Sequence, residues 1–165
     1  MKSKGKLVII GGAVNKGSFT ETSFDQNVEK NLNFFERGIL RKIIDESKSK
    51  EDSVIEVITT ASQIPDIVGP EYKKAFEYLG IKNCNILDIQ NREQANSDAI
   101  VARANAADVV MSTGGDQLRL TSILGGTRFH DAILTKYQTE DFIYAGTSAG
   151  AAAASENMIY QGSSS

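Results

Sequence analysis

Gly146, Ser148 and Gly150 follow the spacing Gly-x-Ser-x-Gly, within the stretch Gly-Thr-Ser-Ala-Gly. This spacing is typical of a nucleophile elbow, a tight strand-to-helix turn whose small residues let the backbone present a serine hydroxyl. The aromatic and β-branched run before the motif predicts a strand, and the alanine-rich run after it predicts a helix. We therefore predict that Ser148 is a catalytic nucleophile. Because Ser is also a common helix N-cap, a purely structural role stays open.

Backbone amides around this serine could stabilise the negative charge that forms when a hydroxyl attacks a carbonyl. We expect the amide of Ala149, at the start of the predicted helix, to face such an oxyanion. A second glycine-rich stretch reads Gly-Gly-Asp-Gln, in which the amides of Gly115 or Asp116 could complete the oxyanion hole. The Gln117 side chain could then bind a substrate carboxylate or carbonyl. The alternative for this stretch is a plain strand-to-helix turn with Asp116 as N-cap.

Strands and helices alternate along the chain in a way that would bring these stretches together. The hydrophobic pattern predicts strands over 6–12, 53–60, 85–89 and 108–113, one that begins at Phe142, and a further short strand over 157–160. It predicts helices over 27–47, 70–79, 92–107, 118–124 and 127–137. Such alternation is typical of an α/β fold, a flavodoxin-like three-layer arrangement in which a parallel sheet has helices on both faces. In these folds ligands bind beyond the carboxyl ends of the strands. The turns at 11–15, 114–117 and 146–150 should therefore meet at one edge.

The composition of the chain limits the classes of function. Its 165 residues are 41% hydrophobic and carry a net charge of −3, as expected of one soluble domain with no dense basic face. We therefore expect neither a nucleic-acid partner nor a membrane partner. A single cysteine and an N-terminus without a signal-type apolar segment are compatible with a cytoplasmic protein, and nothing in the pattern calls for a metal or an organic cofactor.

Three other features have weaker functional interpretations. The glycines of 11–17 resemble a dinucleotide-binding turn, but the segment that follows is polar and lacks a helical pattern. Cys84 opens an apolar run, which favours a packing role. His130, the only histidine, lies in a predicted helix before the nucleophile strand, and we do not assign it as the catalytic base.

Two motifs at matching separation make the chain resemble the cyanophycinases, serine peptidases related to dipeptidase E. The resemblance runs from Lys6 to the end of the chain, and its motifs are Gly-Gly-Asp-Gln-Leu-Arg-Leu at 114–120, Gly-Thr at 126–127 and Gly-Thr-Ser-Ala-Gly-Ala at 146–151. It implies a class I glutamine amidotransferase-like fold and a homodimer. It also implies hydrolysis of cyanophycin, the β-aspartyl-arginine polymer, to dipeptides without metal or cofactor.

The resemblance assigns roles to individual residues. Ser148 would be the nucleophile, Gln117 would line the substrate pocket, and the amides of Gly115, Asp116 and Ala149 would form the oxyanion region. The family's catalytic histidine, its catalytic acid and its arginine-rich substrate contacts have no counterpart within residues 1–165.

A serine hydroxyl needs a general base, and this sequence offers none that matches the family. We therefore expect residues 1–165 to form a single α/β domain that is the N-terminal part of a larger catalytic domain. A C-terminal segment or a second chain would supply the histidine and the acid. Two alternatives stay open, a dipeptidase E-like enzyme acting on short aspartyl peptides and a non-catalytic domain that binds a small ligand.

Overall fold

A computed structural model describes residues 3–11 and 38–158. Their strands form one parallel five-stranded sheet in the order β1-β5-β4-β2-β3, so that the first and last of these described strands are neighbours. The strands are β1 (Lys6–Ile10), β2 (Val54–Ile58), β3 (Asn83–Leu87), β4 (Val109–Ser112) and β5 (Ile143–Thr147). The predicted parallel sheet is confirmed.

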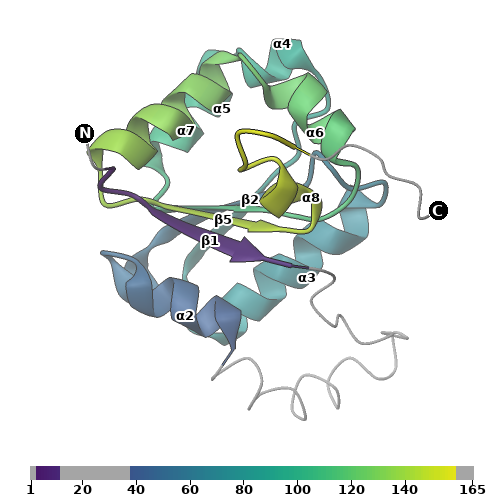
Figure 1. The fold of residues 1–165 in the computed structure, drawn as a ribbon. Helices are drawn as coiled ribbons and strands as arrows, with labels where there is room; N and C mark the ends of the chain where they lie inside the picture. Colours follow the sequence, from purple (N-terminus) through teal and green to yellow (C-terminus); the bar gives the residue numbers. More distant parts are fainter. Residues whose placement is uncertain (1–2, 12–37, 159–165) are drawn as a thin grey trace, which may run out of the picture.

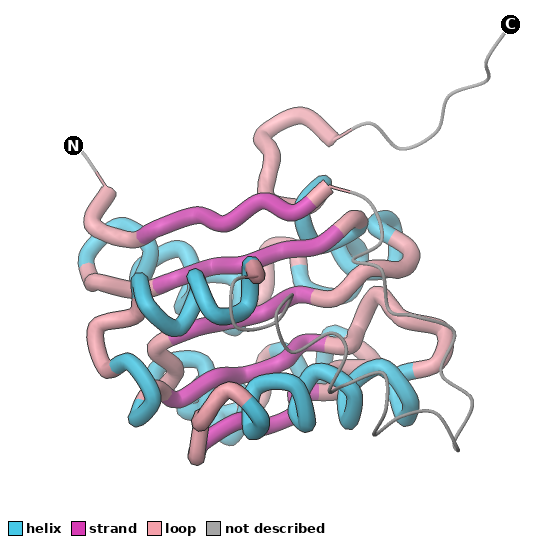
Figure 2. Tube along the Cα trace, turned by 90° about the horizontal axis from the view of Figure 1, so that it is seen from below, coloured by secondary structure: helices cyan, strands magenta, loops and turns pink. Residues whose placement is uncertain are grey.

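Helices cover both faces of this sheet, as Figures 1 and 2 show. Of the described helices, α2 (Ile39–Glu46) and α3 (Pro65–Tyr78) pack on one face, and a short 3-10 helix, η1 (Lys50–Asp52), leads from α2 into β2. The other face carries α4 (Arg92–Ala95), α5 (Asp98–Ala106), α6 (Gln117–Leu124), α7 (Arg128–Thr139) and α8 (Ala149–Ala152). The three-layer arrangement predicted from the alternating pattern is therefore present.

Each face of the sheet has its own hydrophobic core. Because successive side chains of a strand point to opposite faces, β2 contributes Ile55 and Val57 to one core and Ile58 to the other. Phe76 of α3 anchors the first core and Phe142, just before β5, anchors the second, both fully buried. This two-sided burial explains the nearly continuous apolar strands of the sequence.

Two predicted helices differ from the observed ones. The helix predicted over 70–79 begins earlier, at Pro65, a residue type that suits the first helical position because its missing amide hydrogen has no partner there. Pro70 lies inside the helix, where the chain approaches β3 so closely that a Cβ on Gly69 would lie 2.9 Å from Ile86. The single helix predicted over 92–107 is two helices, because the Ser97 hydroxyl accepts from the Ile100 amide and begins a new one.

Two further predictions fall largely outside the described residues. The helix predicted over 27–47 is described only from residue 38, and its described part, α2, buries Leu40, Ile43 and Ile44 as the spacing indicated. The strand predicted over 157–160 is described only at Asn157 and Met158, which have no regular structure.

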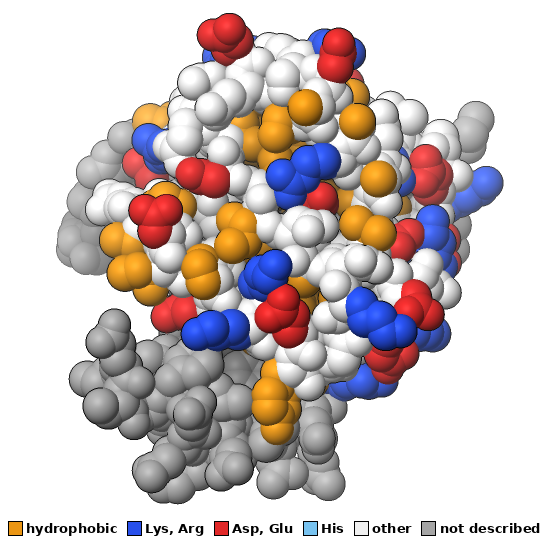
Figure 3. Space-filling model, turned by 180° about the vertical axis from the view of Figure 1, so that it is seen from behind, with side chains coloured by type: hydrophobic (Ala, Val, Ile, Leu, Met, Phe, Trp, Pro, Cys, Tyr) orange, Lys and Arg blue, Asp and Glu red, His pale blue; other side chains and the backbone are white. Residues whose placement is uncertain are grey.

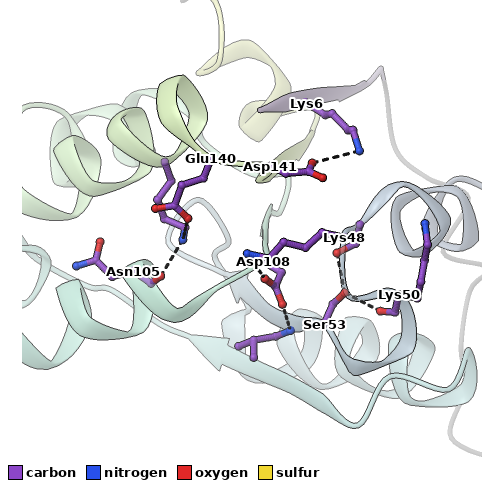
Figure 4. Close-up of polar contacts among 11 residues, drawn as sticks. Lys6, Lys48, Lys50, Ser53, Asn105, Asp108, Glu140 and Asp141 are labelled. Carbon is purple, nitrogen blue, oxygen red and sulfur yellow. Dashed lines mark hydrogen bonds and ion pairs between the residues drawn. The ribbon is translucent and has the colours of Figure 1, made fainter. Parts of the chain in front are cut away.

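Polar contacts occupy the amino ends of the strands (Figure 4). Asp108, just before β4, accepts from the Val54 amide at 3.0 Å and pairs with Lys48 at 3.1 Å, which raises the pKa of Lys48. Lys6, at the start of β1, pairs with Asp141 at 3.2 Å. These contacts join the starts of neighbouring strands, so the amino edge of the sheet has a structural role. In folds of this kind ligands bind at the opposite, carboxyl edge.

The face seen in Figure 3 mixes both signs of charge, with Lys and Arg side chains beside Asp and Glu and scattered hydrophobic groups between them. Among the described residues, no helix has the length and apolar character needed to cross a membrane.

Candidate active site

The carboxyl edge of the sheet presents Ser148 directly after β5. Its neighbours Thr147 and Ala149 are 3% and 2% exposed, whereas Ser148 itself is exposed. Its amide donates to the Ile10 carbonyl at 3.0 Å, which fixes the residue to the end of β1. A polar side chain is thus held out from a buried strand end.

The backbone of Ser148 is strained. Its φ of 47° and ψ of −107° lie outside the regions that residues with a side chain normally adopt. Ser148 is the N-cap residue of α8, but its side chain makes no capping hydrogen bond. The alternative in which Ser148 serves only as a helix cap therefore does not explain why a hydroxyl stands at this position. Strain of this kind persists only where the surrounding structure imposes it, and it gathers at functional sites.

The two glycines of the motif are required by close packing. A Cβ on Gly150 would lie 2.5 Å from the Ser112 carbonyl oxygen of β4, and one on Gly146 would overlap the Gly150 carbonyl. The spacing Gly-x-Ser-x-Gly thus lets α8 begin directly against the sheet.

Tyr144 adds a contact that holds this arrangement. Its hydroxyl donates to the Gly150 carbonyl at 3.0 Å, from a position two residues before Gly146 on β5. Burial raises the pKa of Tyr144, which keeps the hydroxyl protonated and able to donate. The sequence alone did not single out this residue, because an aromatic side chain in a strand is normally a packing residue.

The Gly-Gly-Asp-Gln turn lies against the serine, as the fold predicts for strand ends. A Cβ on Gly114 would lie 3.3 Å from the Ser148 Cβ, so the two turns are in contact distance. Gly115 is exposed and has a φ of +143°, a conformation that favours glycine. The structure therefore brings Ser148, Ala149 and Gly115 to one edge.

Asp116 has a structural role in this turn. Its side chain accepts from the Leu118 amide at 2.8 Å and the Arg119 amide at 3.0 Å, which makes it the N-cap of α6. Its own amide donates to the Ala61 carbonyl at 2.9 Å. Because this amide is engaged, it is not available in this conformation for the predicted oxyanion role, and the Gly115 amide is the remaining candidate of the two.

Gln117 is the first residue of α6, half-buried and next to Asp116 on the same turn. This position is compatible with the predicted contact to substrate.

His130 and Cys84 each contact residues of their own part of the fold. His130 is the third residue of α7, and its Nδ1 accepts from the Gly126 amide at 3.4 Å. Cys84 is buried in β3, and burial raises the pKa of its thiol to about 12, in line with the expected packing role. Across residues 3–11 and 38–158, no group of three or more His, Cys, Asp or Glu side chains gathers as a metal-ligand set. Apart from Gly11, the glycine-rich turn at 11–17 lies outside these ranges.

Comparison with known families decides the membership of this chain. The model of peptidase family S51 matches residues 25–165. The chain belongs to peptidase family S51. The resemblance to the cyanophycinases that the motifs indicated is thereby confirmed, since this S51 chain is 38% identical over 128 residues to a cyanophycinase of a Nostoc species and to one of Trichormus variabilis.

These alignments cover 78% of the S51 chain and 43% of each cyanophycinase. A cyanophycinase of Thermosynechococcus vestitus is 36% identical over 113 residues, which are 68% of this chain and 35% of that protein. The chain thus spans less than half the length of the curated relatives that it matches.

Solved structures share the fold. A peptidase from an acI-B1 actinobacterium superposes with a TM-score of 0.61 at 19% identity, over 88% of the S51 chain and 54% of its own. A putative peptidase E protein of Listeria monocytogenes gives a TM-score of 0.54 at 23% identity, over 72% and 56%. At these identities the likeness establishes the α/β fold.

Proposed function

We propose that this S51 protein is a serine-type peptidase that hydrolyses cyanophycin to β-aspartyl-arginine dipeptides, with Ser148 as nucleophile. The observation that carries the proposal is the strained, exposed Ser148 between a buried strand and a helix start, in a chain of this peptidase family. The cyanophycinases among its relatives support this choice of substrate.

The reaction would proceed in two steps at Ser148. The hydroxyl oxygen attacks the scissile carbonyl carbon while a general base takes the hydroxyl proton, and the amides of Gly115 and Ala149 stabilise the resulting oxyanion. The intermediate then expels the amine, which receives the proton, and leaves an acyl-enzyme on Ser148. Water attacks this ester with the help of the same base and releases the second product.

Neither the base nor its acid partner is assigned within this chain. Its one histidine, His130, is engaged locally at the start of α7. We propose that residues 1–165 act as the N-terminal part of a larger catalytic domain, in which a C-terminal segment or a second chain places a histidine beside Ser148 with a carboxylate behind it. We also propose a homodimer and a cytoplasmic location, the latter because the chain has one cysteine and it is buried and free.

The test compares the full-length protein with its Ser148→Ala variant in cyanophycin hydrolysis and in labelling by a serine-directed fluorophosphonate. We expect Ser148→Ala to abolish both while the protein stays folded, because only the attacking atom is removed. Ser155→Ala is a matched control, since this exposed hydroxyl contacts only nearby backbone, the Ala152 carbonyl at 2.7 Å and the Asn157 carbonyl at 3.0 Å. Full hydrolysis by Ser148→Ala would refute the proposal.

Two outcomes would point to the other candidate functions. Cleavage of short aspartyl dipeptides in preference to the polymer would favour a dipeptidase E-like enzyme. A folded full-length protein whose Ser148 resists the probe would favour a non-catalytic domain that binds a small ligand.

A further inference from the structure

We infer that Arg119 is a positioning residue for the proposed oxyanion hole, because it holds in place the turn against which Gly115 rests. The inference rests on the proposed function in so far as Gly115 donates to the oxyanion. It concerns a side chain on α6 that has no place in the mechanism described above.

The position of Gly115 is set by the turn that follows β2, formed by residues 59–62. A Cβ on Gly115 would overlap the Ala61 carbonyl, so the two backbones are in direct contact. The Asp116 amide donates to the same carbonyl at 2.9 Å. Any displacement of Ala61 therefore displaces Gly115 as well.

Arg119 donates from its Nε to the Thr60 carbonyl at 2.8 Å. Asp116 and Arg119 belong to the same first turn of α6, and they bind consecutive carbonyls of the 59–62 turn. The turn and the start of α6 are thus joined by two hydrogen bonds, one of which comes from a side chain.

The other end of the guanidinium is also fixed. The Nη2 atom of Arg119 donates to Gln90 Oε1 at 2.5 Å, and the side-chain Nε2 of Gln90 in turn donates to Asp88 Oδ1 at 2.5 Å. The Thr59 hydroxyl donates to that same oxygen at 3.1 Å. The contacts therefore form a closed ring from α6, through the residues after β3, back to the 59–62 turn. A planar guanidinium with donors in two directions suits this place better than a lysine ammonium would.

The expected kinetic signature follows from what an oxyanion donor does. The Gly115 amide would bind charge that exists only in the transition state, so a shift of this amide lowers kcat and leaves KM nearly unchanged. A displacement of about 1 Å costs on the order of 100-fold in rate, and removal of one oxyanion donor costs about 100- to 1000-fold.

The experiment uses the full-length protein with Arg119→Met, which keeps the aliphatic stem and removes both donors. Arg92→Met is the matched control, since Arg92 donates to the Ser122 and Gly125 carbonyls at the other end of the same helix, at 2.9 Å and 2.8 Å. For hydrolysis of a β-aspartyl-arginine peptide we expect Arg119→Met to lower kcat by about 10- to 100-fold with KM within about twofold. Arg92→Met should keep nearly the wild-type kcat, and Arg119→Lys, which has one donor nitrogen in place of the two that Arg119 uses, should recover part of the loss.

Hydrogen exchange of the segment 113–118 gives a second readout that does not depend on activity. Arg119→Met should speed exchange at the Asp116 amide, and Arg92→Met should not. A wild-type kcat in Arg119→Met, or exchange in this segment equal to that of the control, would overturn the inference. If the wild-type protein neither hydrolyses the peptide nor reacts at Ser148, the proposed function fails, and the exchange result alone then decides whether Arg119 holds this turn.

Discussion

The strain at Ser148 predicts an unusual effect of glycine on stability. Ser148 has a φ of 47° and a ψ of −107°, a conformation that glycine adopts easily and alanine does not. Relief of such strain is worth about 1–3 kcal/mol, and the greater freedom of glycine in the unfolded chain costs about 0.5–1 kcal/mol. We therefore expect Ser148→Gly to be more stable than Ser148→Ala by up to about 2.5 kcal/mol.

The measurement is urea unfolding of the intact wild-type protein and both variants, with the free energies of unfolding compared. Because the Ser148 hydroxyl makes no capping hydrogen bond, Ser148→Ala should lie within about 0.5 kcal/mol of the wild type. Ala153→Gly is the control, since Ala153 has an ordinary helical φ of −66°. This variant should have a free energy of unfolding about 0.5–1 kcal/mol below that of the wild type. If Ser148→Gly proves less stable than Ser148→Ala, the serine is not strained and this part of our reasoning is wrong.

Three further predictions concern substrate binding, packing and pH. Gln117→Ala should raise KM by about 3- to 10-fold with little change in kcat, if the amide binds ground state and transition state alike; a loss confined to kcat in steady-state assays would contradict this role. Gly150→Ala should lower the free energy of unfolding by about 1–3 kcal/mol in urea titrations, because the added Cβ would meet the Ser112 carbonyl at 2.5 Å. Cys84 should resist iodoacetamide at about pH 8.5 until the protein is unfolded, because burial raises the pKa of its thiol from 9.0 to about 12. Because the pKa of Cys84 is higher in the folded state, the folded protein keeps the thiol proton at a pH where the unfolded chain has lost it. The contribution of the neutral thiol to the free energy of unfolding is therefore complete below pH 9.0 and is lost as the pH rises towards about 12.

The sequence predicted the sheet well because its strands are buried on both faces. Runs such as Val54–Ile58 are apolar at nearly every position, a pattern typical of a parallel strand that is covered on both faces. Helix boundaries were harder to predict. Pro70 reads as a helix start in the sequence, but it lies inside a helix that begins at Pro65 and packs closely on β3 at Gly69.

Within the candidate site, the sequence could name residues that carry a motif and could not name those that act through distant contacts. Ser148 and Gly115 lie in short patterns with a known backbone requirement. Ala61 has no such pattern, yet its carbonyl accepts from Asp116 and thereby removes one of the expected oxyanion amides. Contacts between residues more than fifty positions apart depend on strand order, which periodicity alone does not give.

The pairing of β1 with β5 predicts that the serine turn forms late in folding. Lys6 pairs with Ile143, a separation of 143 − 6 = 137 positions, whereas Val54 pairs with Asn83, a separation of 83 − 54 = 29. Closing the longer loop costs about 1.4 kcal/mol more in chain entropy, so we expect β2 and β3 to join before β1 does. Since the Ser148 amide is bound by the last residue of β1, Ile10, we expect the hydroxyl to reach its final position only when β1 has joined β5. A nascent chain would therefore carry this serine unassembled while the rest of the sheet forms.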